Sequence, residues 1–399
     1  MRTFKYKLQN HKRNKHLHSD LEIIAHVYNH FVALCRRHYR IYGECEGYKR
    51  LTFTRMSKHL TKLKRLSRYA HWHIPYSWAV QNALKRIERG YINFFEGRAK
   101  GPPKFRSRHK YRSMTFDGSQ VKMEPVADAA FGVRHTPVAK ICINKRWYRF
   151  WYSRPIEGTI KQVTIKRDSL GDFYLTLTTD TEGLTPEPLT GETAGFDFGV
   201  KTFLTCSDGT KYESPLFYKR SARNVARANR ALSKKQKGSN HRALTGGDMN
   251  RHKKARLHLA RQHRKIQRQR EDHHWKLALE LVRKFDICFF EDLNLKGMVR
   301  LWGRKFSDLA FSDFMQKIRW QAHKRCKRIE TIDRWTPTTP VCHTCGQRSA
   351  FIDLKVRKWT CSCGITHDRD VNAAINIHQV GTSTVAGEGI RLAPASIPL

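Results

Sequence analysis

The chain has 399 residues, and its 77 Lys and Arg residues against 34 Asp and Glu residues give a formal net charge of +43. This excess is far larger than solubility requires, and it indicates a polyanionic partner. No stretch approaches the roughly 18 to 20 consecutive apolar residues of a membrane-spanning helix, and the first residues lack the apolar core of a signal peptide. We therefore expect a cytoplasmic protein with no membrane partner that binds nucleic acid. A hydrophobic content of 39% predicts folded domains beneath the charge.

The N-terminal half predicts a β-rich module with a helical insertion. Residues of alternating polarity predict a strand over the first ten residues, and apolar residues at helical spacing predict helices between residues 21 and 95. From 113 to 180 the period becomes two, which is typical of strands. We predict a β-barrel, wedge-like domain from residues 1–12 and 100–185, with residues 13–99 as a helical recognition domain inserted in it. A polar, turn-rich linker predicts a domain boundary near residue 190.

One segment of this module alternates two sets of side chains, Trp147, Arg149 and Trp151 against Tyr148, Phe150 and Tyr152. In one interpretation, one set forms the barrel core and the other an ordinary surface. In the other, some of these rings stack on nucleic-acid bases. The sequence leaves both interpretations open.

Two segments concentrate positive charge. Residues 97–112 contain a Gly-Pro-Pro sequence that breaks helices, and they present Lys104 and Arg106 on an extended backbone suited to lie along phosphates. Residues 219–270 hold 18 Lys and Arg residues and one acid, Asp248, within a predicted basic helical segment, residues 219–285. Because repulsion of that size needs counter-charge, we predict a nucleic-acid contact here in preference to a solvated helical face.

Three acids stand in surroundings that suggest a shared cation. Asp197 lies inside the predicted strand 195–199, and Glu291 ends the apolar strand 287–290. The third is Asp368 or Asp370, at the start of a predicted helix. Burying such carboxylates is costly unless a cation or hydrogen bonds compensate them. Two Mg²⁺ ions, or Mn²⁺, bound by these oxygen ligands would suit phosphodiester hydrolysis. Simpler roles remain for single acids, a helix cap at Asp368 or Asp370 and an ion pair with a lysine at Glu291.

Four of the ten cysteines form two knuckles, Cys342 with Cys345 and Cys361 with Cys363, separated by fifteen residues. The spacing predicts a structural zinc ribbon, residues 336–364, in which four thiolates close a tetrahedral site. The second knuckle is one residue shorter than usual. Either its turn is tightened, or His343 or His367 replaces one sulfur, with Cys361 the sulfur most open to replacement.

These residues resemble a known pattern. The segments Gly195-Phe-Asp-Phe-Gly199 and Phe290-Glu-Asp-Leu-Asn294, then the cysteine knuckles and His367-Asp-Arg-Asp370-Val-Asn, look like those of the TnpB family. These are transposon-encoded nucleases related to the type V CRISPR effectors. The likeness extends to Gly101-Pro-Pro-Lys104 with Arg106 and to Lys234, Lys235 and Lys237, and so covers nearly the whole chain.

The resemblance implies an RNA-guided DNA endonuclease, a metal-dependent hydrolase, in a prokaryotic cytoplasm near the nucleoid. It implies that Asp197, Glu291 and Asp370 form the catalytic triad of an RNase H-like (RuvC) α/β domain, residues 190–335 and 365–378. It also implies a non-coding guide RNA from the transposon end and double-stranded target DNA beside a short adjacent motif. Ser77 and Gln81 stand where the family's recognition helix addresses that motif.

Two rival functions are a cleavage-deficient RNA-guided repressor of the same ancestry and a guide-free transposase. The sequence does not decide between monomer and dimer. Residues 379–399 show no apolar period, and we predict a flexible C-terminal tail there.

Overall fold

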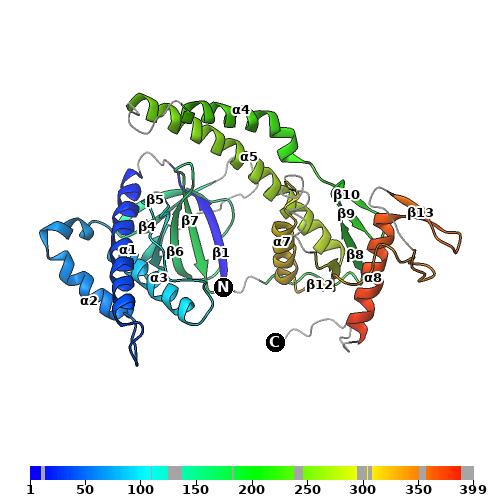
Figure 1. The fold of residues 1–399 in the computed structure, drawn as a ribbon, viewed down its shortest axis with the longest axis horizontal. Coiled ribbons are helices and arrows are strands. Elements are labelled where there is room, and N and C mark those ends of the chain that lie inside the picture. The colour runs from blue at the N-terminus through cyan, green and yellow to red at the C-terminus, as the bar shows by residue number, and fades with distance from the viewer. Residues whose placement is uncertain are drawn as a thin grey trace. The chain divides into compact units, whose positions relative to one another are not determined.

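The computed structural model describes residues 1–9, 14–108, 110–124, 137–181, 184–237, 246–293, 303, 308–349 and 356–387. The chain forms two compact units, residues 1–183 and 184–399, which are described separately below (Figure 1). The boundary between them lies a few residues before the predicted position near 190. None of the helices in the described ranges is long and apolar enough to cross a membrane.

The strands of the first unit form two antiparallel sheets. The larger sheet has the order β1-β7-β6-β2, and its strands are β1 (Arg2–Lys7), β2 (Ser113–Asp117), β6 (Ile160–Arg167) and β7 (Phe173–Thr179). The smaller sheet consists of β3 (Val121–Met123), β4 (Val138–Ile143) and β5 (Arg146–Trp151). A single bridge between Leu8 and Phe150 connects them. The expected closed barrel is therefore not found among the described residues, because one bridge does not continue the hydrogen-bond ladder from sheet to sheet.

Helices fill the chain between β1 and β2, where the insertion was predicted. They are α1 (Lys15–Tyr42), α2 (Phe53–Lys64), the 3-10 helix η1 (Ser67–His73) and α3 (Ser77–Phe95), and a short 3-10 helix η2 (Gly118–Gln120) follows β2. Buried residues of α1 and α3, such as Phe31 and Leu84, belong to the same hydrophobic cluster as Phe150 of β5. The insertion is thus not a separately packed domain, because it shares one core with the sheets.

The second unit is built on a five-stranded sheet in the order β10-β9-β8-β11-β12. The strands are β8 (Thr193–Phe198), β9 (Thr202–Cys206), β10 (Lys211–Glu213), β11 (Ile287–Glu291) and β12 (Arg328–Ile332). β8, β9 and β10 are antiparallel neighbours, whereas β11 runs parallel to both β8 and β12. The interior strand β11, between β8 and β12, is buried on both faces, as its continuous apolar sequence predicts.

Helices cover both faces of this sheet (Figure 1). They are α5 (Gly246–Lys284) and α7 (Phe311–Lys324) on one face and α8 (Arg369–Gly387) on the other, whereas α4 (Phe217–Lys237) packs on α5. Phe290 belongs to the cluster formed with α5 and α7, and its neighbour Phe289 to the cluster formed with α8. This split follows from the period of two along a strand, which sends neighbouring side chains to opposite faces. A small hairpin, β13 (Lys358–Thr360) and β14 (Thr366–Asp368), precedes α8.

The C-terminal helix corrects the predicted tail. α8 continues to Gly387, so the flexible tail predicted from residue 379 was wrong for residues 379–387. Val380 and Val385 pack with Ile377 against the sheet, and Gly381 lies against the ring of Phe289. These four positions have helical spacing and form one stripe. Because one of them is a glycine, the stripe does not stand out as a periodic pattern of apolar residues. Residues 388–399 lie outside the described residues.

Candidate active site and metal centre

Two of the predicted acids stand at one edge of the five-stranded sheet. Asp197 lies near the end of β8, and Glu291 is the last residue of β11. The parallel register pairs Phe290 with Phe196, so each acid directly follows a paired residue. Because parallel strands end at the same edge, the two carboxylates lie side by side at the carboxyl ends of the strands, where α/β sheets bind ligands.

The third acid comes from the first turn of α8. Asp370 is the second residue of that helix, which packs on β8. Ala373 and Ala374 are fully buried in this contact, and Gly195 of β8 leaves no room for a side chain beneath the helix. Small residues on both elements thus bring the start of α8 to the strand that carries Asp197.

The electrostatics of Asp197 indicate that Glu291 and Asp370 lie close enough to act on it. Burial, together with the smaller effects of the Asp370 and Glu291 charges, raises the pKa of Asp197 to about 8, against a lowering effect of Arg369. Burial also raises the pKa of Glu291, with a smaller contribution from Asp292. Gathered carboxylates of this kind are destabilising unless a cation compensates them.

The structure separates the roles of the two candidate aspartates on α8. The carboxylate of Asp368 accepts hydrogen bonds from the backbone N–H groups of Asp370 (3.1 Å) and Val371 (3.2 Å), and it forms an ion pair with Lys211 (2.7 Å). Asp368 is therefore the helix cap. Asp370 is the one whose charge acts on Asp197.

Two arginines, which the sequence analysis did not single out, accompany the acids. Asp370 forms ion pairs with Arg357 (2.8 Å) and Arg369 (3.1 Å). In the described part of the chain, by contrast, no lysine or arginine forms an ion pair with Glu291, so its alternative role as a lysine partner finds no support. In the sequence, Arg357 lies close to the second knuckle and Arg369 directly precedes Asp370, which could have indicated a role near the site. The contact between Arg357 and the Asp370 carboxylate becomes visible only in the fold.

The donor set of the three acids fits a hard divalent cation. It consists of carboxylate oxygens, the ligands that Mg²⁺ and Mn²⁺ prefer, and contains neither histidine nor cysteine. The acids are set more openly than the cysteines described next, since in the described ranges only the cysteines gather all their ligand atoms within 4.8 Å.

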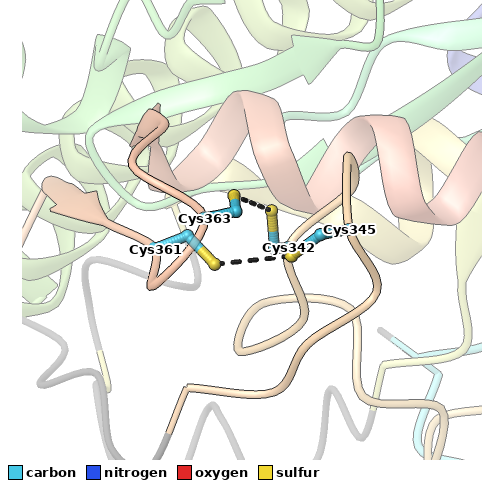
Figure 2. A group of neighbouring side chains, drawn as sticks. All are labelled: Cys342, Cys345, Cys361 and Cys363. Atoms are coloured by element: carbon cyan, nitrogen blue, oxygen red, sulfur yellow. Dashed lines mark hydrogen bonds between the residues drawn. The ribbon is translucent and has the colours of Figure 1, made fainter.

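The four cysteines of the two knuckles converge on one point (Figure 2). The Sγ atoms of Cys342 and Cys363 are 3.9 Å apart, and those of Cys345 and Cys361 are 3.6 Å apart. Tetrahedral zinc with Zn–S bonds of about 2.3 Å requires S–S separations of about 3.8 Å. The cluster thus has the dimensions of a structural zinc site, with Cys361 included.

Local backbone geometry explains how the short second knuckle reaches the cluster. Gly364 has φ +86° and donates its N–H to the carbonyl of Cys361 (2.9 Å), and Gly346 closes the first knuckle in the same way on Cys342. Burial raises the pKa of the Cys342 thiol, but backbone N–H groups of Cys345 and Thr344 outweigh it, so that the pKa falls to about 7. Hydrogen bonds led by the Cys363 N–H lower the pKa of Cys361 to about 6. At these two cysteines the thiolate, the form that binds zinc, is favoured, whereas at Cys345 a backbone hydrogen bond from Gln347 is outweighed by burial and the neighbouring thiols, which raise its pKa to about 12.

The two histidines proposed as alternative ligands lie beside the cluster. His367 Nε2 is 3.0 Å from Cys342 Sγ, whereas the ring of His343 is hydrogen-bonded to the side chain of Asn372 (3.0 Å). Neither is needed to complete a set of four sulfurs. The tightened turn is thus the alternative that the geometry favours.

Two asparagines missed by the sequence analysis join the knuckle region to α8. Asn372 and Asn376 are buried and stand one helical turn apart. Both donate side-chain hydrogen bonds of 2.7 Å to the carbonyl of Val341, and Asn376 also bonds to that of Thr338. In the sequence, two asparagines four residues apart among apolar helix residues could have indicated this contact, because buried amides need hydrogen-bond partners.

The predicted nucleic-acid residues of the first unit lie on its surface. Ser77 is the exposed first residue of α3, and Gln81 follows one turn later, half-buried. Lys104 and Arg106 are exposed on an extended segment, and Asn29 of α1 fixes that segment by bonding the N–H and carbonyl of Arg106 (2.9 and 2.8 Å). The backbone is held while the basic side chains stay accessible.

The predicted basic residues of the second unit lie on α4. Lys234 and Lys235 are exposed there. Lys237 is the last residue of the helix, and its side chain lies outside what the structure describes. α4 and α5 pack against each other, which concentrates the basic segment into one helical pair.

Comparisons with known proteins agree with this architecture. A family model described as "Probable transposase" matches residues 167–301, and one described as "Cas12f1-like, TNB domain" matches residues 311–377. The chain is also similar to a Cas12f1 protein solved as an sgRNA–target DNA complex, with a TM-score of 0.55 and 14% identity over 90% of this chain and 82% of the other. A structure of the mini-RNA-guided endonuclease CRISPR-Cas phi3 gives a TM-score of 0.51 and 10% identity over 100% and 93%. The chain is therefore an α+β protein with the fold of these compact CRISPR effectors.

Sequence relatives define the family. A Streptomyces pristinaespiralis protein named "Putative RNA-guided DNA endonuclease" is 32% identical over 363 residues, 88% of this chain and 82% of its own. An Escherichia coli (strain K12) protein named "Putative RNA-guided DNA endonuclease InsQ" is 26% identical over 357 residues, 85% and 83%. A mimivirus protein named "TnpB-like protein L79" is 28% identical over 246 residues, 57% of this chain and 45% of its own. This chain belongs to the TnpB family, the transposon-encoded relatives of the type V CRISPR effectors.

Proposed function

We propose that this protein is an RNA-guided endonuclease that cuts double-stranded DNA beside a short adjacent motif, with Asp197, Glu291 and Asp370 as its catalytic acids. The observation that carries the proposal is the placement of Asp197 and Glu291 at one edge of the sheet, beside the helix whose first turn carries Asp370. Three antiparallel strands followed by two parallel ones, with α8 delivering the third acid, support a RuvC-type domain.

The residues present fit two Mg²⁺ or Mn²⁺ ions. Asp197, Glu291 and Asp370 would hold them, and such ions supply polarisation of the phosphate and activation of water when bound. Asp197 contributes a carboxyl group desolvated by the strand, which a bound cation would keep in its charged form. Asp368 keeps the start of α8 in place by capping it, and so orients Asp370.

Zinc at the four cysteines would serve structure rather than chemistry, because four thiolates leave no open coordination position. The knuckles adjoin α8 through the hydrogen bonds of Asn372 and Asn376. A closed metal site there would therefore help hold Asp370 in position.

The basic surfaces suit the proposed partners, a guide RNA from the transposon end and its DNA target. The segment with Lys104 and Arg106 and the helical pair α4–α5 offer a large excess of positive charge for phosphates. Ser77 and Gln81, on one face at the start of α3, are proposed to read the adjacent motif. Base pairing by the guide would supply the remaining specificity.

The test begins with the RNA that copurifies with the full-length protein. Sequencing that RNA gives the guide, and a plasmid carrying the matching target beside a randomised flank reports both cleavage and motif. We expect Mg²⁺-dependent cleavage of both strands, retained in Glu330→Gln on β12 and absent in Asp197→Ala. RNA without cleavage by the wild-type protein would favour a repressor, and cleavage without bound RNA a guide-free enzyme.

A further inference from the structure

The outer face of the β4–β5 hairpin carries two exposed tryptophans. Trp147 is 52% exposed and Trp151 is 43% exposed, and the exposed Arg149 lies between them on the same face of β5. Tyr148 and Phe150 point the other way and are buried. We call the surface formed by Trp147, Arg149 and Trp151 the Trp-Arg-Trp face.

The rings stand on a rigid base. Beneath the face, the ring of Phe150 packs on Tyr6 at 5.1 Å, and the hydroxyl of Tyr148 is hydrogen-bonded to His16 (3.0 Å). Asn144 and Lys145, with φ of +51° and +60°, form a two-residue turn that fixes the register of the hairpin. The tryptophans are therefore presented by an anchored strand and lose little freedom when a ligand binds.

Positive charge surrounds the two rings. Lys140 on β4 stands opposite Arg149, and Lys122 on β3 stands opposite Cys142, which in turn is the partner of Trp147. The acid beside them, Glu124, forms an ion pair with Lys140 (2.9 Å). Residues at alternate positions of a strand lie about 7 Å apart, so the Cα of Arg149 is about that far from the Cα of each tryptophan.

This combination suits unpaired nucleic acid better than a protein partner. Every base offers a flat face to an indole, and a cation between two stacking positions meets the phosphate that joins the stacked nucleotides. An apolar protein patch, in contrast, would have to desolvate Arg149 at its centre. Exposed aromatics on a sheet are also the means by which sheet-based RNA modules hold single strands.

We infer that the Trp-Arg-Trp face binds an unpaired stretch of RNA, stacking bases on Trp147 and Trp151 and holding the intervening phosphate with Arg149. The choice of RNA over DNA rests on the proposed function, in which RNA is the permanent partner. Glu124 adds an acceptor for a 2′-hydroxyl group. The face belongs to the first unit, whereas the three acids and the four cysteines belong to the second.

The test is a binding titration of the full-length protein, freed of copurified nucleic acid, with a labelled 12-nucleotide oligouridine and its DNA counterpart. Replacing both rings, Trp147→Ala with Trp151→Ala, should weaken RNA binding by about 10-fold or more and leave the salt dependence unchanged, since no charge is removed. Trp147→Phe with Trp151→Phe should restore most of the binding, which a merely structural role would not predict. Trp335→Ala, at an 84% exposed tryptophan elsewhere, is the matched control and should bind as wild type.

Charge is tested separately. Arg149→Gln should lower the salt dependence by about one counterion and keep the stacking contribution. The inference is overturned if the double alanine variant, folded by its circular dichroism spectrum, binds oligouridine as wild type does, or if the DNA oligonucleotide binds more tightly than RNA. If that variant does not fold, Arg149→Gln decides instead. The inference is then overturned if this variant has the oligouridine affinity of wild type and the same slope of log affinity against log salt concentration. The oligonucleotide titration contains no guide RNA, target DNA or divalent metal. Its outcome is therefore independent of whether the protein cleaves DNA in the plasmid assay.

Discussion

A Cβ atom on Gly195 would lie 2.3 Å from the carbonyl oxygen of Ala374, so strand β8 and helix α8 touch backbone to backbone. This contact sets the distance between the strand that carries Asp197 and the helix that carries Asp370. No side chain larger than hydrogen fits there, and the oxygen cannot turn away because it belongs to a helix.

Gly195→Ala should therefore push α8 from the sheet. We expect a loss of stability on the order of 2–4 kcal/mol and a large loss of cleavage, because Asp370 moves with the helix. Thermal unfolding and the plasmid assay measure the two effects. Gly101→Ala is the control, since a Cβ there meets nothing within 4 Å; equal behaviour of the two variants would contradict the role assigned to the contact.

Asp197→Asn keeps the size of the side chain and removes its charge. Cleavage should fall by at least about 100-fold, because a metal ligand is lost, while affinity for RNA and target DNA changes little. In EDTA the same variant should unfold at a higher temperature than wild type, because the repulsion among the three acids is relieved. A lower unfolding temperature in EDTA would mean that this carboxylate is structural.

Stability should depend on pH through His274, which is buried between α5 and α7. Burial lowers its pKa to about 4 from an unfolded value of 6.5, against the raising effect of Asp313, while Lys317 and His273 lower it further. Between those values the unfolded chain binds a proton that the folded chain does not, so this contribution to stability is complete above pH 6.5 and is lost as the pH falls toward 4.

His274→Phe, which can stack on Phe203 as the imidazole does at 5.4 Å, should remove that part of the pH dependence. The expected difference between pH 7 and pH 4.5 is on the order of 2–3 kcal/mol. Denaturant unfolding at several pH values measures it. Parallel curves for the variant and wild type would show that the proton uptake lies elsewhere.

Zinc binding is predicted to involve all four cysteines. Cys342→Ser and Cys361→Ser should each release the metal, measured by elemental analysis of the purified protein, and lower the unfolding temperature. Cys326→Ser is the control, since this exposed thiol lies outside the cluster. Full zinc content in Cys361→Ser would instead favour a histidine as the fourth ligand, with His367 the nearer one.

The helical pair α4–α5 is predicted to bind phosphates. Lys234→Gln with Lys235→Gln should reduce the slope of log affinity against log salt concentration by about 1.4 to 1.8. Lys276→Gln is the control, because that lysine is already paired with Asp272 at 2.7 Å. An unchanged slope in the double variant would assign these lysines to another role.

The sequence by itself determined the chemistry that is local and rare. Acids inside apolar strands, paired cysteines and long basic runs are costly or unusual, so each already indicated its role at Asp197, at Glu291 and at the knuckles. The alternation of Trp147 and Trp151 with Tyr148 and Phe150 was predictable too, because a period of two follows directly from strand geometry, but the sequence left open which set is buried.

Only the tertiary structure decided which of these groups meet. It assigned Asp368 to the helix cap, brought Arg357 to Asp370 and joined α8 to the knuckles through Asn372 and Asn376. It also replaced the expected barrel by two sheets and extended α8 beyond residue 379. Burial, backbone contact and charge interaction depend on residues distant along the chain, and no local pattern encodes those distances.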